Sequence, residues 1–274
     1  MSTMLGRLFK AKETTLSSKE TYNFLVVAAL QEELSAFTEL TSKLARIKKL
    51  SSGAVEYSYK KTIKKNYKIL TYTSNKMGMA YNAASIMRVI MHHQPLFIFF
   101  IGTCAGLNSD EQKPGDVLVP HFIYNYESGK HTDNGEFKPD HICLETDEEV
   151  RKYAEIIKKK VDKDFNVFTD ENFCSGSAVV DNIEKRKKIV EQIPRKVTGL
   201  DMEAYSLACI NNILKEEGKK VSVIKGIMDF GQDKTASEKA DNKQKAKVNS
   251  AKFTLALIEY VEENVLNVDT VFIN

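Results

Sequence analysis

The sequence has 274 residues, 42% of them hydrophobic, which is enough to bury one large α/β core. Its net charge of +3 combines 40 basic with 37 acidic residues, so no strong field favours nucleic acid, and a small-molecule ligand is the better expectation. No apolar run is long enough for a membrane span or a signal peptide, which predicts a cytoplasmic protein without membrane contact.

The cysteines and glycine motifs give no evidence for a bound cofactor. The four cysteines are far apart, form no CxxC pair and have no histidine at metal-ligand spacing. We therefore expect free thiols in a reducing compartment rather than disulfides or a zinc site. The segment Gly102–Gly106 fits neither the dinucleotide fingerprint nor the P-loop, so no organic cofactor is expected either.

The first 22 residues form a separate N-terminal arm in this interpretation. They are polar apart from an apolar stripe of Met4, Leu5, Leu8 and Phe9. A disordered or packing arm is favoured over a membrane or partner anchor, because four apolar side chains bury little area. No linker rich in Pro, Gly or Ser divides residues 23–274, which are therefore expected to form one domain.

From residue 23 onward, strand patterns alternate with helix patterns. The predicted strands are 24–30, 55–63, 67–73, 96–101, 115–124, 165–169, 197–201 and 221–228. The predicted helices are 31–46, 79–93, 145–161, 182–192, 202–216 and 239–264. This alternation indicates the α/β class, with a single three-layer αβα domain around a mixed, mostly parallel sheet. The nearly uniform apolar runs at 96–101 and 221–228 are typical of strands covered on both faces.

Three of these strands end in polar chemistry. Glu33 follows the first strand, Gly102–Gly106 follows the strand 96–101, and Asp229 follows the strand 221–228. Because ligands of open α/β sheets bind at the carboxyl ends of strands, these ends predict one shared cleft. Taken singly, each has a simpler interpretation: Glu33 and Glu203 as first-turn helix acids, Asp229 as a turn residue, and Gly102–Gly106 as a strand-to-helix connection.

The order of five blocks carries more weight than any one of them. Together the blocks resemble the nucleoside phosphorylase and nucleosidase superfamily over roughly residues 23 to 262, especially the branch containing 5′-methylthioadenosine/S-adenosylhomocysteine nucleosidase. The blocks are Ala29–Leu34, Gly102–Leu107 with Gly115–Val117, Ser175–Val180, Gly199–Tyr205 and Lys225–Asp229. The segment Tyr124–Lys130 is most similar to nucleosidase-like domains attached to regulatory or bacterial defence proteins. The resemblance also implies a homo-oligomer, since family members often complete the 5′ pocket with a neighbouring subunit.

The resemblance implies a catalytic role for three carboxyl groups. Asp229 would protonate or hydrogen-bond N7 of a purine as the glycosidic bond breaks, Glu33 would hold and activate the attacking water, and Glu203 would accept hydrogen bonds from the ribose hydroxyls. Such a division suits glycoside cleavage, because an oxocarbenium-like transition state needs an acid for the leaving group and carboxylates near the sugar. Burial at the end of an apolar strand would favour the protonated form of Asp229.

The remaining expected contacts are substrate-binding. The Met202 backbone and Met77 would lie beside the sugar, Val179 and Val180 would read the base through backbone groups, and Lys225 would replace a family arginine with poorer bidentate geometry. On their own chemistry, two further residues are candidates, since Thr103 offers a hydroxyl to a sugar or an anion and glycine lets the backbone approach a ligand closely, as at Gly106.

Two departures from the family pattern favour water over phosphate as the nucleophile. Related hexameric phosphorylases have a Gly-Asp-Pro-x-Arg loop where this sequence has Ala29–Glu33, and an arginine where it has Phe100. A carboxylate at Glu33 would repel a phosphate dianion but suits the acceptance of a proton from water. A third departure concerns the acid, because Met228 and Gly231–Gln232 replace residues that usually support Asp229.

We therefore expect hydrolysis of the N-glycosidic bond of a purine nucleoside or derivative, with adenine compounds first. The alternatives are a nucleotide-level nucleosidase acting on AMP or ATP in defence, a phosphorolytic enzyme, and a catalytically weak purine sensor. One surface bears on this choice. Lys239, Lys243 and Lys247 share a helical face opposite a core stripe of Val248, Ala251, Leu255 and Ile258. This face is expected to be solvated and without influence on specificity, and a phosphate-binding rim that admits nucleotides is the less favoured alternative.

Overall fold

The computed structural model describes residues 22–62, 65–140, 142–161, 164–180, 182–193, 195–230 and 236–266. The predicted N-terminal arm lies outside these residues, apart from Tyr22, which is buried in the core. No helix in the described ranges is both long enough and apolar enough to cross a membrane.

One large sheet organises the chain. Its strands are β1 (Phe24–Ala28), β2 (Leu44–Lys49), β3 (Val55–Thr62), β4 (Lys65–Thr73), β5 (Phe97–Gly106), β6 (Val117–Asn125), β9 (Cys143–Glu145), β10 (Val167–Ser175), β11 (Val197–Asp201) and β12 (Lys220–Asp229). Neighbours follow the order β11-β10-β6-β12-β5-β1-β4-β3-β2, with β9 beside β6. The predicted mixed, mostly parallel sheet is confirmed, since β4, β1, β5 and β12 run parallel in succession while β2 and β3 form an antiparallel edge.

The sheet also closes on itself at one end. β11 pairs antiparallel with β5 through Gly199 opposite Gly106 and Leu200 opposite Ala105. The strands β5, β12, β6, β10 and β11 therefore form a ring. This closure brings the carboxyl ends of β5, β11 and β12 to one place, beside the end of β1.

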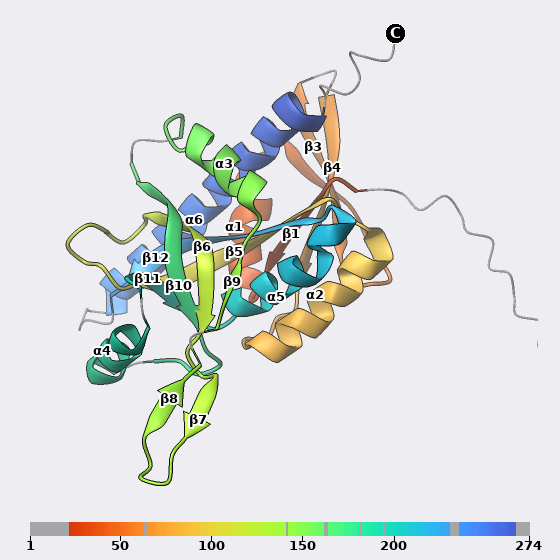
Figure 1. Ribbon diagram of the computed structural model, residues 1–274. Helices are drawn as coiled ribbons and strands as arrows, with labels where there is room; N and C mark the ends of the chain where they lie inside the picture. The colour runs from red at the N-terminus through yellow and green to blue at the C-terminus, as the bar shows by residue number, and fades with distance from the viewer. Residues whose placement is uncertain are drawn as a thin grey trace, which may run out of the picture.

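Helices cover both faces of the sheet (Figure 1). They are α1 (Gln31–Thr38), α2 (Met79–His93), α3 (Glu148–Ile157), α4 (Ile183–Gln192), α5 (Ala204–Leu214) and α6 (Ala236–Val261), with a 3-10 turn at Lys215–Glu217 and a π turn at Glu262–Leu266. The helices α2 and α5 pack on one face, whereas α1, α3 and α6 pack on the other. The three-layer architecture predicted from the sequence is thus observed.

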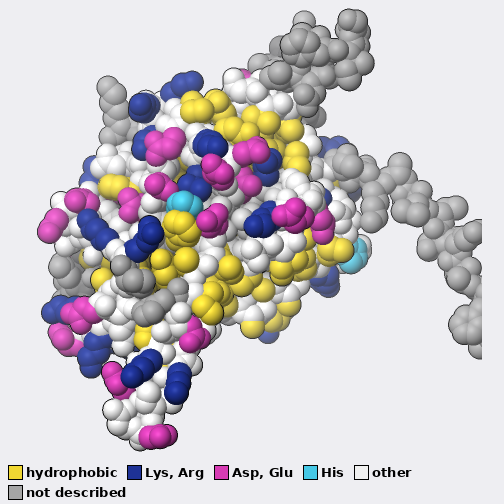
Figure 2. All heavy atoms as spheres, viewed as in Figure 1, with side chains coloured by type: hydrophobic (Ala, Val, Ile, Leu, Met, Phe, Trp, Pro, Cys, Tyr) yellow, Lys and Arg dark blue, Asp and Glu magenta, His cyan; other side chains and the backbone are white. Residues whose placement is uncertain are grey.

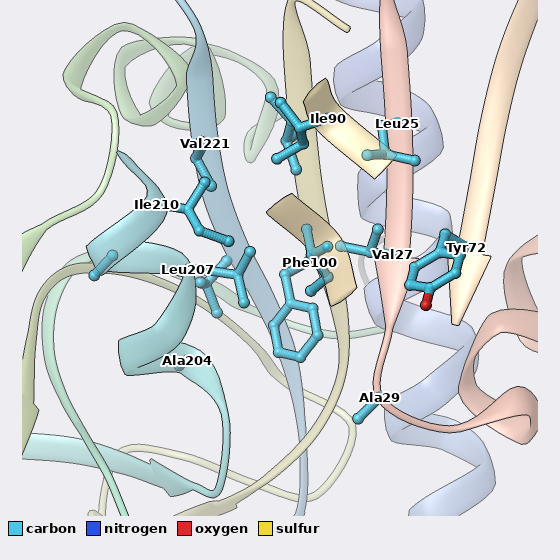
Figure 3. Packing of buried hydrophobic residues seen from close by; sticks show 14 of the residues in the cluster. Leu25, Val27, Ala29, Tyr72, Ile90, Phe100, Ala204, Leu207, Ile210 and Val221 are labelled. Carbon is cyan, nitrogen blue, oxygen red and sulfur yellow. The ribbon is translucent and has the colours of Figure 1, made fainter. Parts of the chain in front are cut away.

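Strand alternation explains these two faces. In β1, Leu25 and Val27 join the core under α2 and α5, while Phe24 and Val26 join the core under α1, α3 and α6. A strand points successive side chains to opposite faces, so a strand covered on both sides must be apolar throughout. Figure 3 shows the first of these cores, where Leu207 of α5 lies beside Phe100 of β5.

A short hairpin projects from this body. β7 (Gly129–His131) pairs with β8 (Phe137–Pro139) in a separate two-stranded sheet, which was not predicted from the sequence. It extends away from the helices at the bottom of Figure 1, and Figure 2 shows charged side chains of both signs on it. With three residues in each strand, it offers too little apolar periodicity to be recognised from sequence.

Other differences arise where pairing overrides local pattern. The predicted helix 31–46 ends at Thr38, and Leu44–Lys49 instead forms an edge strand whose side chains are exposed except Leu44. The predicted connection Gly102–Gly106 belongs to β5, because it pairs with β12 and β11.

The core stripe predicted on α6 is only half right. Two of its members, Ala251 and Ile258, are buried, whereas Val248 and Leu255 are only partly covered. Phe253, Leu257 and Val261 supply most of the remaining apolar contact. The buried face of α6 is therefore wider than its sequence pattern indicated, and the neighbouring lysines lie closer to the protein body than expected.

The contact between β12 and α6 generates a prediction about stability. A Cβ on Gly226 would lie 2.1 Å from the Ala246 carbonyl oxygen, so only glycine allows the strand and the helix to approach this closely. We expect Gly226→Ala to lower the free energy of unfolding by about 1–3 kcal/mol or more, as overpacking of a core does. Urea unfolding measures this. Gly135→Ala in the hairpin is the control, because nothing lies within 4 Å of its added Cβ and only its positive φ opposes the change. Equal effects of the two substitutions would contradict the packing argument.

Candidate active site

A cavity of about 350 Å³ lies where the ends of β1, β5, β11 and β12 meet. Its lining contains four carboxyl groups and three cationic side chains among apolar neighbours. The residues that line it are Ala29, Leu30, Glu33, Met77, Thr103, Cys104, Ala105, Ala178, Val179, Val180, Arg186, Leu200, Asp201, Met202, Glu203, Met228, Asp229, Lys239 and Lys243. The polar strand ends predicted to share a cleft therefore do so, and the volume suits a small molecule.

Three hydrogen bonds hold Glu33 in one orientation in the cavity lining. Its side chain is buried, and one oxygen accepts hydrogen bonds from the Thr103 amide at 2.8 Å and the Thr103 hydroxyl at 3.1 Å. Its other oxygen accepts from the Leu30 amide at 3.3 Å. Gly102 makes room for this arrangement, because a Cβ there would lie 2.7 Å from Glu33 Oε1 and its φ of +147° is rarely adopted by other residues.

Asp201 orients the end of β11 and the start of α5. Its carboxylate accepts hydrogen bonds from the Glu203 amide at 3.2 Å, the Ala204 amide at 3.0 Å and the Ser175 hydroxyl. A side chain that satisfies the first amides of a helix fixes the direction in which that helix begins. The result is that Glu203, at the N-cap of α5, points toward the cavity.

Glu203 itself is buried, and its Oε1 accepts a hydrogen bond from the Gly78 amide at 2.9 Å. Burial raises the pKa of Glu203 to about 7, although the Lys225 ammonium opposes this shift. The loop before α2 is fixed in turn by Asn82, whose amide donates to the Lys76 and Gly78 carbonyls. Met77 in this loop is 55% exposed and lies at the cavity mouth.

Lys225 lies behind the cavity wall rather than in its lining. The side chain is 1% exposed, and its ammonium is 3.1 Å from Asp201 Oδ2 and 4.0 Å from the centre of the Phe100 ring. Burial alone lowers the pKa of Lys225, but the charges of Asp201 and the two buried glutamates outweigh it, so the pKa lies above its usual value. Lys225 therefore stays charged and compensates the carboxylates around it.

Asp229 shares its end of the cavity with an arginine. Its Oδ1 lies 3.6 Å from Arg186 Nη1, and the Asp229 side chain is 22% exposed. Arg186 comes from α4, where its Nε donates to the Val180 carbonyl at 2.8 Å. Its Nη1 is buried and makes no hydrogen bond within the described residues. The surroundings of Asp229 are thus partly open and contain a cation, whereas the sequence led us to expect burial at the end of an apolar strand.

The loop that follows β10 closes the same end. Glu127 accepts hydrogen bonds from the Ser177 amide at 2.6 Å and the Ala178 amide at 3.3 Å, while the Tyr126 hydroxyl donates to the Ala178 carbonyl at 3.1 Å. These contacts hold the loop against the end of β6. Val180 is buried, whereas Val179 is 68% exposed at the mouth of the cavity.

Most residues singled out in the sequence meet here. The cavity is lined by eight of them: Glu33, Met77, Thr103, Val179, Val180, Met202, Glu203 and Asp229. Gly106 does not line it, since the space beside its Cα is filled by Phe230 and Ile227, and Lys225 lies behind Asp201 as described above.

Four charged residues of the lining were not predicted as part of the site: Asp201, Arg186, Lys239 and Lys243. Arg186 lies three positions before the buried Ile189 and so shares its helical face, but this spacing alone does not assign Arg186 to a site. Lys239 and Lys243 are accessible to solvent, as expected of a solvated helical face, but both also border the cavity.

Other reactive groups of the cavity are accounted for. Cys104 is buried, and burial raises the pKa of its thiol well above the usual value, so the thiol is protonated and is a poor nucleophile. All four cysteines are free thiols, as predicted. Within the described ranges no three His, Cys, Asp or Glu side chains come close enough together to hold a metal ion.

Comparison with known proteins identifies the family and the fold. The phosphorylase superfamily model matches residues 23–259. The structure is similar to futalosine hydrolase of Helicobacter pylori, with a TM-score of 0.69 and 19% identity over 87% of this chain and 98% of that one. It is similar to 5′-methylthioadenosine/S-adenosyl homocysteine nucleosidase of the same organism, with a TM-score of 0.68 and 19% identity over 87% and 98% of the two chains.

A third similar structure is a putative 5′-methylthioadenosine/S-adenosylhomocysteine nucleosidase from Borrelia burgdorferi bound to adenine. Its TM-score is 0.67, with 21% identity over 86% of this chain and 99% of that one. Identities this low establish a shared fold and leave the substrate to the chemistry of the cavity. Comparison with the curated proteins found no match.

The raised pKa of Glu203 predicts a change of stability with pH. Below its usual value of 4.5 the carboxyl is protonated in both states, whereas between 4.5 and about 7 only the folded state retains the proton. This contribution to stability is therefore lost as the pH rises through about 7. Relative to Glu203→Gln, which has no proton to lose, the parent should lose on the order of 3 kcal/mol of unfolding free energy between pH 4 and 8. Urea unfolding of both proteins tests this, and a constant difference across the range would contradict it.

Proposed function

The chain belongs to the phosphorylase superfamily, and from this membership and the cavity we propose that it hydrolyses the N-glycosidic bond of a purine nucleoside or derivative. The observation that carries the proposal is the meeting of Glu33, Glu203 and Asp229 around one cavity. Glycoside cleavage needs an acid for the leaving group and carboxylates beside the sugar, and these three side chains offer both.

In this proposal Glu33 is the base that activates water. Three hydrogen bonds fix its carboxylate in one orientation, which suits a group that must point a water molecule at C1′ of the sugar. Glu203 accepts hydrogen bonds from the ribose hydroxyls, and its negative charge stabilises the sugar cation as it develops. Its raised pKa means that this function strengthens as the pH rises through about 7.

Asp229 and Arg186 serve the leaving base. Asp229 protonates or hydrogen-bonds N7 of the purine, and Arg186, whose buried Nη1 makes no hydrogen bond within the described residues, can stabilise negative charge on the departing ring. Adenine is the first base to test, because the similar Borrelia burgdorferi structure holds adenine. The backbone of Ala178–Val180 lies beside these two residues and supports the plane of the base.

Water is favoured over phosphate as the nucleophile. The resemblance to related phosphorylases implies a phosphate-binding arginine at the position of Phe100. The Phe100 ring lies under the Lys225 ammonium, which already neutralises buried carboxylates. A phosphate dianion beside Glu33 would face a fixed negative charge.

The first expectation is that free purine base and free sugar form in phosphate-free buffer. Chromatography of the products from adenosine, methylthioadenosine, S-adenosylhomocysteine and AMP, each with and without phosphate, measures this. Hydrolysis should proceed equally in both buffers, since no phosphate takes part. A sugar 1-phosphate as the main product, with no turnover when phosphate is removed, would overturn the proposal.

The second expectation concerns Asp229→Asn, which preserves shape but cannot deliver a proton. Turnover should fall by about 10²–10⁴, the usual contribution of a positioned acid, while KM changes much less because an amide can still contact N7. Asp110→Asn is the matched control, since Asp110 is exposed and outside the cavity. If the purified Asp229→Asn protein keeps its melting temperature and full activity, Asp229 is only a turn residue.

A further inference from the structure

We propose that the substrate carries a phosphate group, which Lys239 and Lys243 bind at one edge of the cavity. The substrate class would then be nucleoside phosphates rather than uncharged nucleosides. This inference rests on the proposed function and specifies its substrate. It rests on three observations: the two lysines line the cavity, positive charge exceeds negative charge around them, and the other lining residues are already assigned to the base and the sugar.

Both lysines enter the lining from the beginning of α6. Lys239 is exposed, Lys243 is 38% exposed, and they lie four positions apart on one helical face. The helix is fixed against β12 by the close approach of Gly226 to Ala246, so the lysines have a defined place relative to the end of β12. The N-terminal end of a long helix also adds partial positive charge at this edge.

The edge has more positive than negative charge. Glu32 is the partner of both Lys243, at 2.5 Å, and Lys247, at 3.4 Å. Lys239 makes no ion pair with any residue in the described part of the chain. Lys239, Lys243 and Lys247 together with Glu32 carry a net charge of about +2, and Glu238 in the first turn of α6 lowers it to about +1, which still favours a phosphate anion. A phosphate oxygen is also a stronger acceptor than water for an ammonium group that lacks a partner.

The remaining lining is already assigned by the proposed function. Arg186 contacts both Asp229 and Val180 at the end that receives the base. Glu203 and Met77 belong to the sugar, which they reach from the start of α5 and the loop before α2. Lys243 binds Glu32 of α1, so the lysine edge lies beside α1. This edge is not used by the base or the sugar and can bind a third group attached to the sugar.

Inorganic phosphate could supply the same chemistry as a co-substrate. The lysine edge is next to α1, whose Glu33 follows Glu32 directly and faces the cavity as a fixed carboxylate. A free dianion close enough to attack C1′ would have to approach that carboxylate, whereas a phosphate attached to the sugar can stay at the edge. We therefore assign the phosphate to the substrate.

The test compares AMP with adenosine for the parent and for Lys239→Ala/Lys243→Ala. The parent should have a higher kcat/KM on AMP than on adenosine. In the double variant the ratio of the two values should fall by about 10- to 100-fold, the effect expected from losing hydrogen bonds to a charged group. Lys245→Ala is the matched control, because it removes one charge from an exposed position of the same helix outside the cavity, and it should keep the parent ratio.

The outcomes separate this inference from the function on which it rests. If the parent cleaves adenosine as well as AMP and the double variant keeps the same ratio, the phosphate edge is wrong while hydrolysis stands. If cleavage of adenosine appears only when inorganic phosphate is added, the lysines serve the free ion and the inference is overturned.

If neither compound is cleaved, the proposed function fails, and calorimetric binding of AMP and adenosine then decides the inference. Tighter binding of AMP that disappears in the double variant would support a phosphate site. Equal binding of the two compounds would overturn it.

Discussion

The buried ammonium of Lys225 is the interaction on which the rest of the site depends. Glu33, Asp201 and Glu203 are all buried at the same end of the sheet, and bringing several carboxylates out of water is costly unless a cation compensates them. Lys225 contributes that cation from β12. Its ammonium forms an ion pair with Asp201 and lies over the Phe100 ring. Removal of this one group would leave the buried acids uncompensated, so the chemistry and the stability of the domain are linked at a single residue.

The topology explains why these groups meet. Pairing of β11 with β5 closes the ring of strands, so that Asp201 at the end of β11 reaches both Lys225 and the first turn of α5. The absence of a side chain at Gly102 lets Glu33 approach the Thr103 amide. Each carboxyl is thus held by backbone groups from a different element, which restricts its motion before any ligand arrives, and such preorganisation is what catalytic electrostatics requires.

Much of the fold could be predicted because its signals are local. The apolar runs at Phe97–Ile101 and Val221–Met228 indicate buried parallel strands, and the polar residues after them mark the cleft. The predicted helix 31–46 overlaps the first half of the edge strand Leu44–Lys49, because the basic residues there suit either state and only the pairing with β3 decides. Arg186, Asp201, Lys239 and Lys243 could not be assigned to the cavity for a related reason: their roles come from contacts with residues far away in the chain, and charge on a helix is usually a solvated face.

The most direct test of the account is a crystal structure of the Asp229→Asn protein with adenosine in the cavity. The account predicts the purine between Asn at position 229 and the Ala178–Val180 backbone, with N7 within hydrogen-bond distance of the introduced amide. The ribose hydroxyls should contact Glu203, and a water molecule should lie between Glu33 and C1′. Adenosine bound away from these three side chains, or with its anomeric carbon out of reach of any water held by Glu33, would contradict it.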